Sequence, residues 1–341
     1  MRRLRAVAAH VVRPPPSSPS SSSSSASSDG DAAGIVDLEF FRAHGYVVVP
    51  QAVPPSQVAA AVGDNAALLG MDMANPAEWY NDSGGEYGQA PLEVGPGMVE
   101  LYQSQGLWDN RCAPRVHRAF AEILGSDQLL VTMDRCNFKP PTRGPADGWN
   151  KGLPLHWDGP RPGEATPFTQ ELGVQGALFL SGAGPGSGGF MCVDGFAKEW
   201  EEHGLCTEEG GALKGLPFAD QPFASRAEPI EVTGKAGDLL IWNRLLPHGN
   251  AANMSDTPRI AQFISMYRKD AAPRSRRRFG VSPEDELDNR VGLWQKKKLG
   301  SYSRWEGVDG GRWGTDGVHP EGPEVAKLTD LGLKLLGIEE W

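Results

Sequence analysis

The chain has 341 residues, enough for one large domain or two small ones with a sizeable core. Its 33 basic and 43 acidic side chains give a formal charge of −10, which argues against duplex nucleic acid as a partner. No uninterrupted apolar run approaches ~20 residues, so the sequence predicts no membrane span. The 4 cysteines are widely spaced without a CxxC pair, which disfavours a zinc ribbon or a disulfide-dense secreted scaffold and indicates a reducing compartment.

Residues 1–34 differ in composition from the rest of the chain. Arginines come first, then three prolines and a serine run from Ser20 to Ser25, and no acid precedes Asp29. Such acid-poor, Arg- and Ser-rich segments occur in organellar transit peptides, which would direct the protein to a plastid or mitochondrion. A disordered tail on a cytoplasmic or organellar protein explains the composition equally well, and both interpretations remain open.

Folded structure is expected from residue 35 to residue 341, and three of the four predicted helices precede the main run of strands. Apolar residues recur at helical spacing in four segments, and a glycine directly follows the first of them, where it would end the helix. An apolar strand is expected at 46–49, where Pro50 ends it. Helices are predicted over residues 36–44, 57–69, 115–124 and 327–336.

From Leu129 the pattern changes to short apolar runs separated by glycine- and proline-rich turns. Strands are predicted over residues 129–138, 153–157, 173–180, 189–193, 230–232, 238–243 and 259–267. Since no βαβ alternation is visible, we expect a mainly β fold with flanking α-helices, namely a cupin-like jelly roll or double-stranded β-helix. Its core would span about 129–270, and 271–341 would form a C-terminal extension. The aromatic residues of this extension either pack over the barrel, which their size favours, or line a substrate lid.

Two histidines and one aspartate carry the strongest chemical signal. His156 and Asp158 are two residues apart, so both side chains would lie on the same face of an extended strand. His248 follows the apolar strand and can supply a third ligand. Two imidazoles and one carboxylate form the facial triad that holds non-heme Fe(II). Arg259, which follows on the next strand, can hold a dicarboxylate through its two-pronged guanidinium group.

These residues resemble the phytanoyl-CoA dioxygenase family. The similar stretches are residues 45–49, 155–159, 188–196 and 237–250, with Arg259 after them, and the resemblance covers roughly residues 35–270. It implies a double-stranded β-helix, and it implies His156, Asp158 and His248 as the iron ligands. It also implies that Arg259 pairs with the far carboxylate of 2-oxoglutarate.

The resemblance implies an Fe(II)- and 2-oxoglutarate-dependent dioxygenase. Such an enzyme would use O2 to hydroxylate a small or medium organic substrate and would release succinate and CO2, with ascorbate as a candidate further cofactor. Because Asp158 occupies the carboxylate position that related halogenases leave open for halide, hydroxylation or desaturation is favoured over halogenation. Neither the substrate nor the oligomeric state follows from the sequence.

Two positions in the co-substrate pocket depart from the family pattern. Asn250 stands where a serine is common, and Gln175 stands where a tryptophan often lies. Asparagine and glutamine both hydrogen-bond carboxylates, so these side chains remain candidates for binding 2-oxoglutarate. The Gly-Ser-His ending common after the glycine-rich strand is replaced here by residues 194–196.

Three further side chains lie on or next to the strand before the HxD segment. Asn137 and Lys139 are candidates for facing 2-oxoglutarate or the substrate, although a lysine before two prolines also fits a solvated strand end. Arg135 is a candidate for an acidic group of the substrate. Two other classes of protein remain as alternatives: a catalytically silent jelly-roll binding or regulatory protein, and a cupin-like enzyme that uses zinc or manganese without 2-oxoglutarate.

Overall fold

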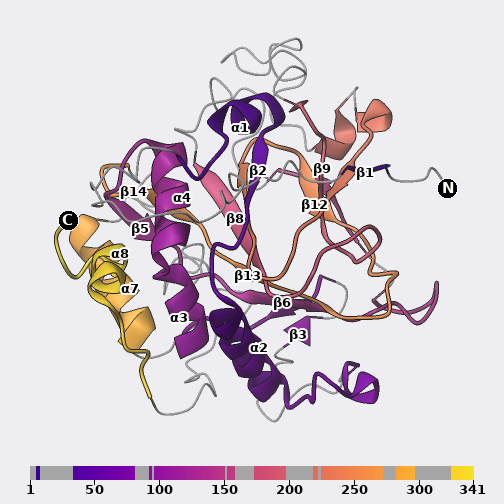
Figure 1. Ribbon diagram of the computed structural model, residues 1–341, viewed down its shortest axis with the longest axis horizontal. Helices are drawn as coiled ribbons and strands as arrows, with labels where there is room; N and C mark the ends of the chain where they lie inside the picture. Colours follow the sequence, from indigo (N-terminus) through magenta and orange to yellow (C-terminus); the bar gives the residue numbers. More distant parts are fainter. Residues whose placement is uncertain are drawn as a thin grey trace, which may run out of the picture.

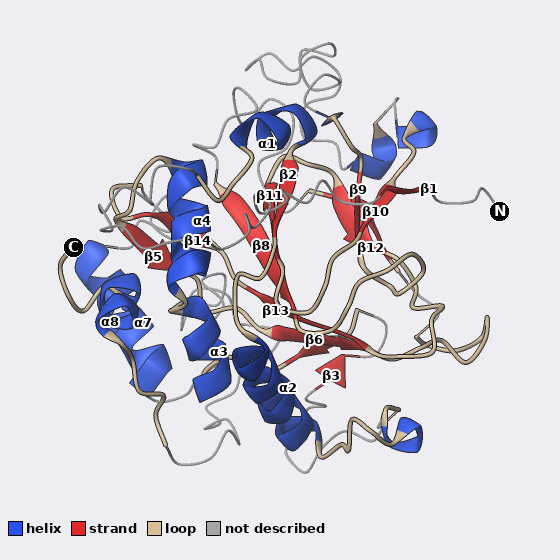
Figure 2. Ribbon diagram, in the orientation of Figure 1, coloured by secondary structure: helices blue, strands red, loops and turns tan. Residues whose placement is uncertain are grey.

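The computed structural model describes residues 5–7, 34–80, 92–93, 96–149, 152–157, 173–196, 218–221, 224–271, 282–295 and 324–341. Its centre is a pair of β-sheets, and the longer helices cover the outer face of the larger sheet (Figures 1 and 2). The predicted mainly β architecture with flanking helices is therefore confirmed.

The larger sheet has seven strands in the order β2-β11-β8-β13-β6-β4-β3. These strands are β2 (Tyr46–Val49), β3 (Leu92–Glu93), β4 (Met98–Val99), β6 (Cys136–Lys139), β8 (Val174–Phe179), β11 (Leu239–Asn243) and β13 (Arg259–Phe263). The smaller sheet has five strands in the order β1-β10-β9-β12-β7. They are β1 (Arg5–Val7), β7 (Leu153–His156), β9 (Phe190–Cys192), β10 (Ile230–Val232) and β12 (His248–Asn250).

The chain crosses repeatedly between the two sheets. Of the eight strands from β6 to β13, β6, β8, β11 and β13 join the larger sheet, and β7, β9, β10 and β12 join the smaller one. All the pairs among these eight strands are antiparallel. This arrangement is the double-stranded β-helix that the sequence predicted.

Two predicted strands are each divided in the structure. The segment 129–138 forms β5 (Leu129–Val131) and β6, and the segment 259–267 forms β13 and β14 (Met266–Arg268). β5 and β14 pair only with each other, in a separate two-stranded sheet. The two breaks lie side by side, because Thr132 N–H donates to Ser265 O at 2.8 Å. The prediction of two continuous strands was wrong because apolar alternation does not reveal which partner a strand will have.

Four predicted helices are confirmed to within three residues at each end. They are α1 (Leu38–His44), α2 (Pro55–Leu69), α4 (Pro114–Leu124) and α8 (Asp330–Leu336). The first begins after Asp37, whose side chain accepts from Phe40 N–H, and ends at Gly45 with a left-handed φ of 81°. Two helices were not predicted, α3 (Gln105–Arg111) and α7 (Pro283–Gln295), together with the 3₁₀ turns Pro76–Glu78, Phe218–Asp220 and Ala224–Arg226.

The larger sheet separates two apolar clusters. Along β11, Leu239 and Ile241 pack toward the helices, whereas Leu240 and Trp242 pack between the sheets. The same alternation on β6 directs Cys136 and Phe138 to the helical layer. Asn137 and Lys139 therefore face the space between the sheets, where the site residues lie.

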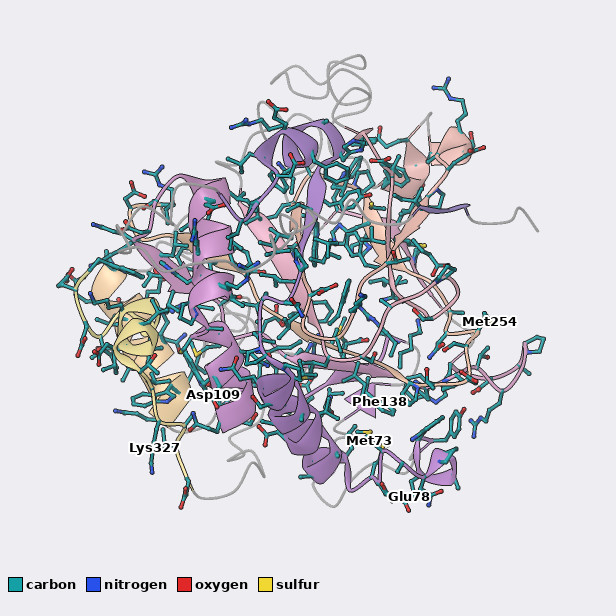
Figure 3. All side chains as sticks on the ribbon, in the orientation of Figure 1. Met73, Glu78, Asp109, Phe138, Met254 and Lys327 are labelled. Atoms are coloured by element: carbon teal, nitrogen blue, oxygen red, sulfur yellow. The ribbon has the colours of Figure 1, made fainter. Side chains whose placement is uncertain are left out.

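Helices α7 and α8 pack together beside β5, at the end of the molecule that carries the C-terminus (Figure 1). Trp294 of α7 donates its indole N–H to Ala326 O at 3.0 Å, in agreement with a packing role. Tyr302, Trp305 and Trp313 lie outside the described residues. Met254, with 67% of its surface exposed, lies at the opposite edge of the molecule (Figure 3). Within the described ranges, no helix is long and apolar enough to cross a membrane.

Candidate functional site

The two histidines predicted as metal ligands meet between neighbouring strands of the smaller sheet. His156 is the last residue of β7 and His248 is the first of β12, and the two are direct partners in the antiparallel register. Their ring centroids are 4.7 Å apart with the planes inclined by 47°. Residues separated by 92 positions in the sequence are thereby placed within reach of one ion.

Both imidazoles are oriented in the same way. Nδ1 of His156 lies 2.9 Å from Pro154 O, and Nδ1 of His248 lies 2.8 Å from Leu246 O. A carbonyl oxygen only accepts, so each Nδ1 carries a proton, and the neutral form of either ring has its lone pair at Nε2. Metal-binding histidines are usually held in this way by a backbone carbonyl.

Aromatic packing fixes the ring of His248, which is only 5% exposed. Phe190 stacks on it with centroids 5.6 Å apart and planes inclined by 15°, and Trp242 contacts it at 5.3 Å. Neither aromatic residue was singled out from the sequence, because apolar residues at alternate strand positions ordinarily signal only core packing.

Gly249 is required here for a steric reason. A Cβ atom on this residue would lie 2.2 Å from Leu153 O and 3.0 Å from Pro154 O, both on the adjacent strand β7. Glycine therefore lets β7 and β12 approach closely enough for His156 and His248 to meet.

Asp158, the third predicted ligand, lies outside the described residues. The described part of the chain accordingly contains two of the three predicted ligands, and no group of three His, Cys, Asp or Glu side chains within it could hold a metal.

Arg259 lies at the start of β13 and is 4% exposed. Its Nη1 donates to Asn137 Oδ1 at 2.7 Å, while its Nε is buried without a hydrogen-bond partner in the described structure. Burial lowers the pKa of the guanidinium to about 10. A buried cation with an unsatisfied donor calls for an anionic ligand.

Lys139 is the register partner of Arg259 and is fully buried, so the alternative of a solvated strand end is wrong. Its ammonium donates to Asn250 Oδ1 and to Ala251 O, both at 2.8 Å, and so links the larger sheet to the smaller one. Burial, followed by the charge of Arg259, lowers the pKa of Lys139 to about 7. Two buried basic side chains are therefore adjacent between the sheets.

The two departures from the family pattern have distinct surroundings. Asn250 is buried, and its Oδ1 also accepts from Leu153 N–H at 3.1 Å. Gln175 on β8 is the register partner of Trp242 on β11. A tryptophan is therefore present beside Gln175 on the neighbouring strand, and its buried Nε1 has no hydrogen-bond partner among the residues described.

A second charged cluster is formed by Arg135, directly before β6, with Glu100 and Tyr102, which follow β4. Arg135 Nη1 donates to Glu100 Oε1 at 2.5 Å, and Tyr102 Oη donates to Glu100 Oε2 at 3.0 Å. Sequence inspection identified Arg135 but neither of its partners, because they come from a part of the chain without a recognisable motif.

A jelly roll with paired histidines and a buried arginine on the facing sheet is the architecture of the iron- and 2-oxoglutarate-dependent oxygenases. The family model for phytanoyl-CoA dioxygenase matches residues 41–261. The chain belongs to this family, and it is an Fe(II)/2-oxoglutarate dioxygenase whose cofactors are iron and 2-oxoglutarate.

Individual relatives are distant. A Dictyostelium discoideum protein named as a phytanoyl-CoA dioxygenase is 23% identical over 260 residues, which cover 67% of this chain and 74% of that protein. The 2-aminoethylphosphonate dioxygenase of an uncultured bacterium is 25% identical over 197 residues, covering 57% and 66%. The solved structure of the GlcNAc-inducible gene 2 protein of Candida albicans has a TM-score of 0.60 at 12% identity, covering 89% of this chain and 76% of that one, and shares the fold.

Proposed function

We propose that this dioxygenase hydroxylates a small or medium organic substrate at an iron ion held by His156, Asp158 and His248. The observation that carries the proposal is the register pairing of the two histidines, with both Nδ1 atoms bound to carbonyls and both lone pairs at Nε2. Asp158, two residues after His156, would complete the triad. Because the triad keeps its carboxylate, hydroxylation is favoured over halogenation.

In this proposal 2-oxoglutarate binds between the histidines and the buried cations. Arg259 would bind the far carboxylate through its unsatisfied Nε and the adjacent N–H donors in the plane of its guanidinium. Lys139 adds a second positive charge, while Asn137 and Asn250 hold the two cations in position through their amide oxygens. Gln175 would line the wall of the pocket.

When bound, iron together with 2-oxoglutarate and O2 supplies the oxidation of a substrate C–H bond, and 2-oxoglutarate leaves as succinate and CO2. The protein contributes geometry, charge and exclusion of water. Phe190 and Trp242 pack around His248 and shield it from solvent. The relative named for 2-aminoethylphosphonate acts on a compound of the small size class proposed here.

Anaerobic addition of Fe(II) and 2-oxoglutarate tests the assignment directly. We expect a weak visible charge-transfer band from wild-type protein and none from His248→Ala. His117→Ala is the matched control, because that histidine contacts Asp127 O and Trp341 outside the site. If folded wild-type protein gives no band, or if the band survives His248→Ala, the proposal is wrong. A silent scaffold would give no band, and a zinc or manganese enzyme would not require 2-oxoglutarate.

The role of Arg259 has its own test. Arg259→Ala should raise the dissociation constant of 2-oxoglutarate by about 10- to 100-fold, the range expected when a buried charged hydrogen bond is lost. Iron affinity, measured without 2-oxoglutarate, should change much less. Equal losses of both affinities would contradict the assignment.

A further inference from the structure

The side chains of Glu100, Tyr102 and Arg135 form a polar cluster on the inner face of the larger sheet. Along β6, Asn137 and Lys139 point inward and Cys136 points to the helices, so Arg135 lies on the inward side by alternation. The register of β4 with β6 pairs Val99 with Cys136, which places Glu100 beside Arg135.

This cluster lies at the same end of the barrel as the paired histidines. Arg135 O accepts from Phe263 N–H at 3.0 Å, and Phe263 is the register partner of Ala177 on β8. Gln175, two residues further along β8, pairs with Trp242, whose ring lies 5.3 Å from His248.

Lys139 and Arg259 lie at the other end of the barrel. Lys139 ends β6 and Arg135 directly precedes that strand, so the two are four residues apart, which corresponds to about 13 Å at the rise of a β-strand. The region around Arg135 is thus separate from the buried pair Lys139 and Arg259.

The hydrogen bonds of the cluster determine which charge it can offer to a ligand. Both carboxylate oxygens of Glu100 already accept, one from Arg135 and one from Tyr102. Arg135 uses only Nη1, and within the described residues its Nε and Nη2 make no hydrogen bond. The arginine side chain is 20% exposed and that of Glu100 is 9% exposed. Glu100 therefore fixes the guanidinium of Arg135, whose Nε and Nη2 donors remain able to bind an anion.

We propose that Arg135 binds an anionic group of the substrate, a carboxylate or a phosphate or phosphonate, and that Glu100 and Tyr102 position its guanidinium. This inference rests on the proposed function, because it assumes that the substrate reacts at the paired histidines. Since Arg135 and the histidines lie at the same end, we expect the anion and the reacting carbon to belong to one small molecule. The substrate class is accordingly a small organic acid.

The test compares three series of compounds of equal chain length: short-chain carboxylic acids, alkyl phosphonates and the primary amides of the acids. Each is added anaerobically to protein loaded with Fe(II) and 2-oxoglutarate, and binding is followed as a change in the visible band. Succinate formation in air is the second readout. Acids or phosphonates should change the visible band and increase succinate formation, and their relative affinities should show which anion the site prefers. The amides should neither change the band nor increase succinate formation.

Substitutions at Arg135 make the test specific. Arg135→Gln should raise the half-saturating concentration of the anion about 10- to 100-fold, and Arg135→Lys should give an intermediate value because it keeps the charge without the fork. The dissociation constant of 2-oxoglutarate should change by no more than about twofold. Arg268→Gln is the matched control, since Arg268 pairs with Asp270 in an exposed ion pair.

The two hypotheses fail in different ways. If wild-type protein forms no band with Fe(II) and 2-oxoglutarate, the proposed function is wrong. If the band forms but no anion perturbs it, or amides bind as well as acids, or Arg135→Gln leaves the half-saturating concentration unchanged, the inference about Arg135 is wrong and the proposed function stands.

Discussion

Replacing Gly249 with alanine tests whether the close approach of β7 and β12 builds the site. The added Cβ would lie 2.2 Å from Leu153 O, about 1.2 Å short of an ordinary contact of 3.4 Å. The obstructing atom belongs to the backbone of a paired strand, so the strands themselves must separate. We expect a loss of about 3 kcal/mol of unfolding free energy, from overpacking and weakened ladder hydrogen bonds.

The same displacement would separate His156 from His248, which are paired one residue before Gly249. Metal sites tolerate ligand shifts of only about 0.2 Å, so Fe(II) affinity should fall by at least about tenfold. Thermal unfolding of the metal-free protein and anaerobic titration of the visible band measure the two effects separately. By the usual relation for a domain of this size, the midpoint of unfolding should fall by about 5 °C.

Gly63→Ala provides the control. Gly63 lies on the exposed side of α2, where an added Cβ would have no atom within 4 Å. This change should raise the unfolding free energy by about 0.5–1 kcal/mol and leave iron binding unchanged. The reasoning is refuted if Gly249→Ala melts within about 2 °C of wild type and binds iron with unaltered affinity.

Two further predictions concern buried cations. The pKa of Lys139 is about 7 in the folded protein, below the ordinary 10.5. Between pH 7 and 10.5 the unfolded chain therefore binds more protons at this group than the folded protein does. Lys139 accordingly makes the stability of the ligand-free protein rise with pH across that range. If 2-oxoglutarate binds to charged Lys139, its affinity should fall as pH rises above 7, and calorimetry in buffers of different ionisation enthalpy should detect proton uptake; Lys139→Met should remove both effects. Arg290 of α7 donates to Leu336 O at 3.0 Å and to Val131 O at 2.8 Å. Arg290→Met should therefore lower the unfolding free energy by about 3 kcal/mol in a denaturation experiment, while 2-oxoglutarate binding stays within twofold.

Sequence patterns predicted the jelly roll and four helices because those segments carry their signals locally. Residues 46–49 and 230–232 form strands with the expected boundaries. Helices α3 and α7 were missed because their apolar residues follow no clear helical period, and α7 is stabilised by a distant contact: Arg290 holds the last carbonyls of α8. Local periodicity cannot register such long-range contacts.

The candidate site was likewise predicted in part from local sequence signals and decided in part by long-range contacts. The spacing of His156 and Asp158, the distant His248 and the following Arg259 were sufficient to predict the chemistry, because a facial triad and a dicarboxylate clamp need those residue types. The tertiary structure decided that His156 and His248 are register partners and that Lys139 is buried against Arg259.

By itself, the sequence determined the fold class and the family and predicted the residues that would bear the chemistry, since these depend on short patterns and residue types. Only the tertiary structure decided why Gly249 must be glycine, where Trp242 lies relative to Gln175, and that Glu100 holds Arg135. Each of these depends on which strands become neighbours. That choice is made by packing across the whole domain, where residues far apart in the chain come within a few ångströms of one another.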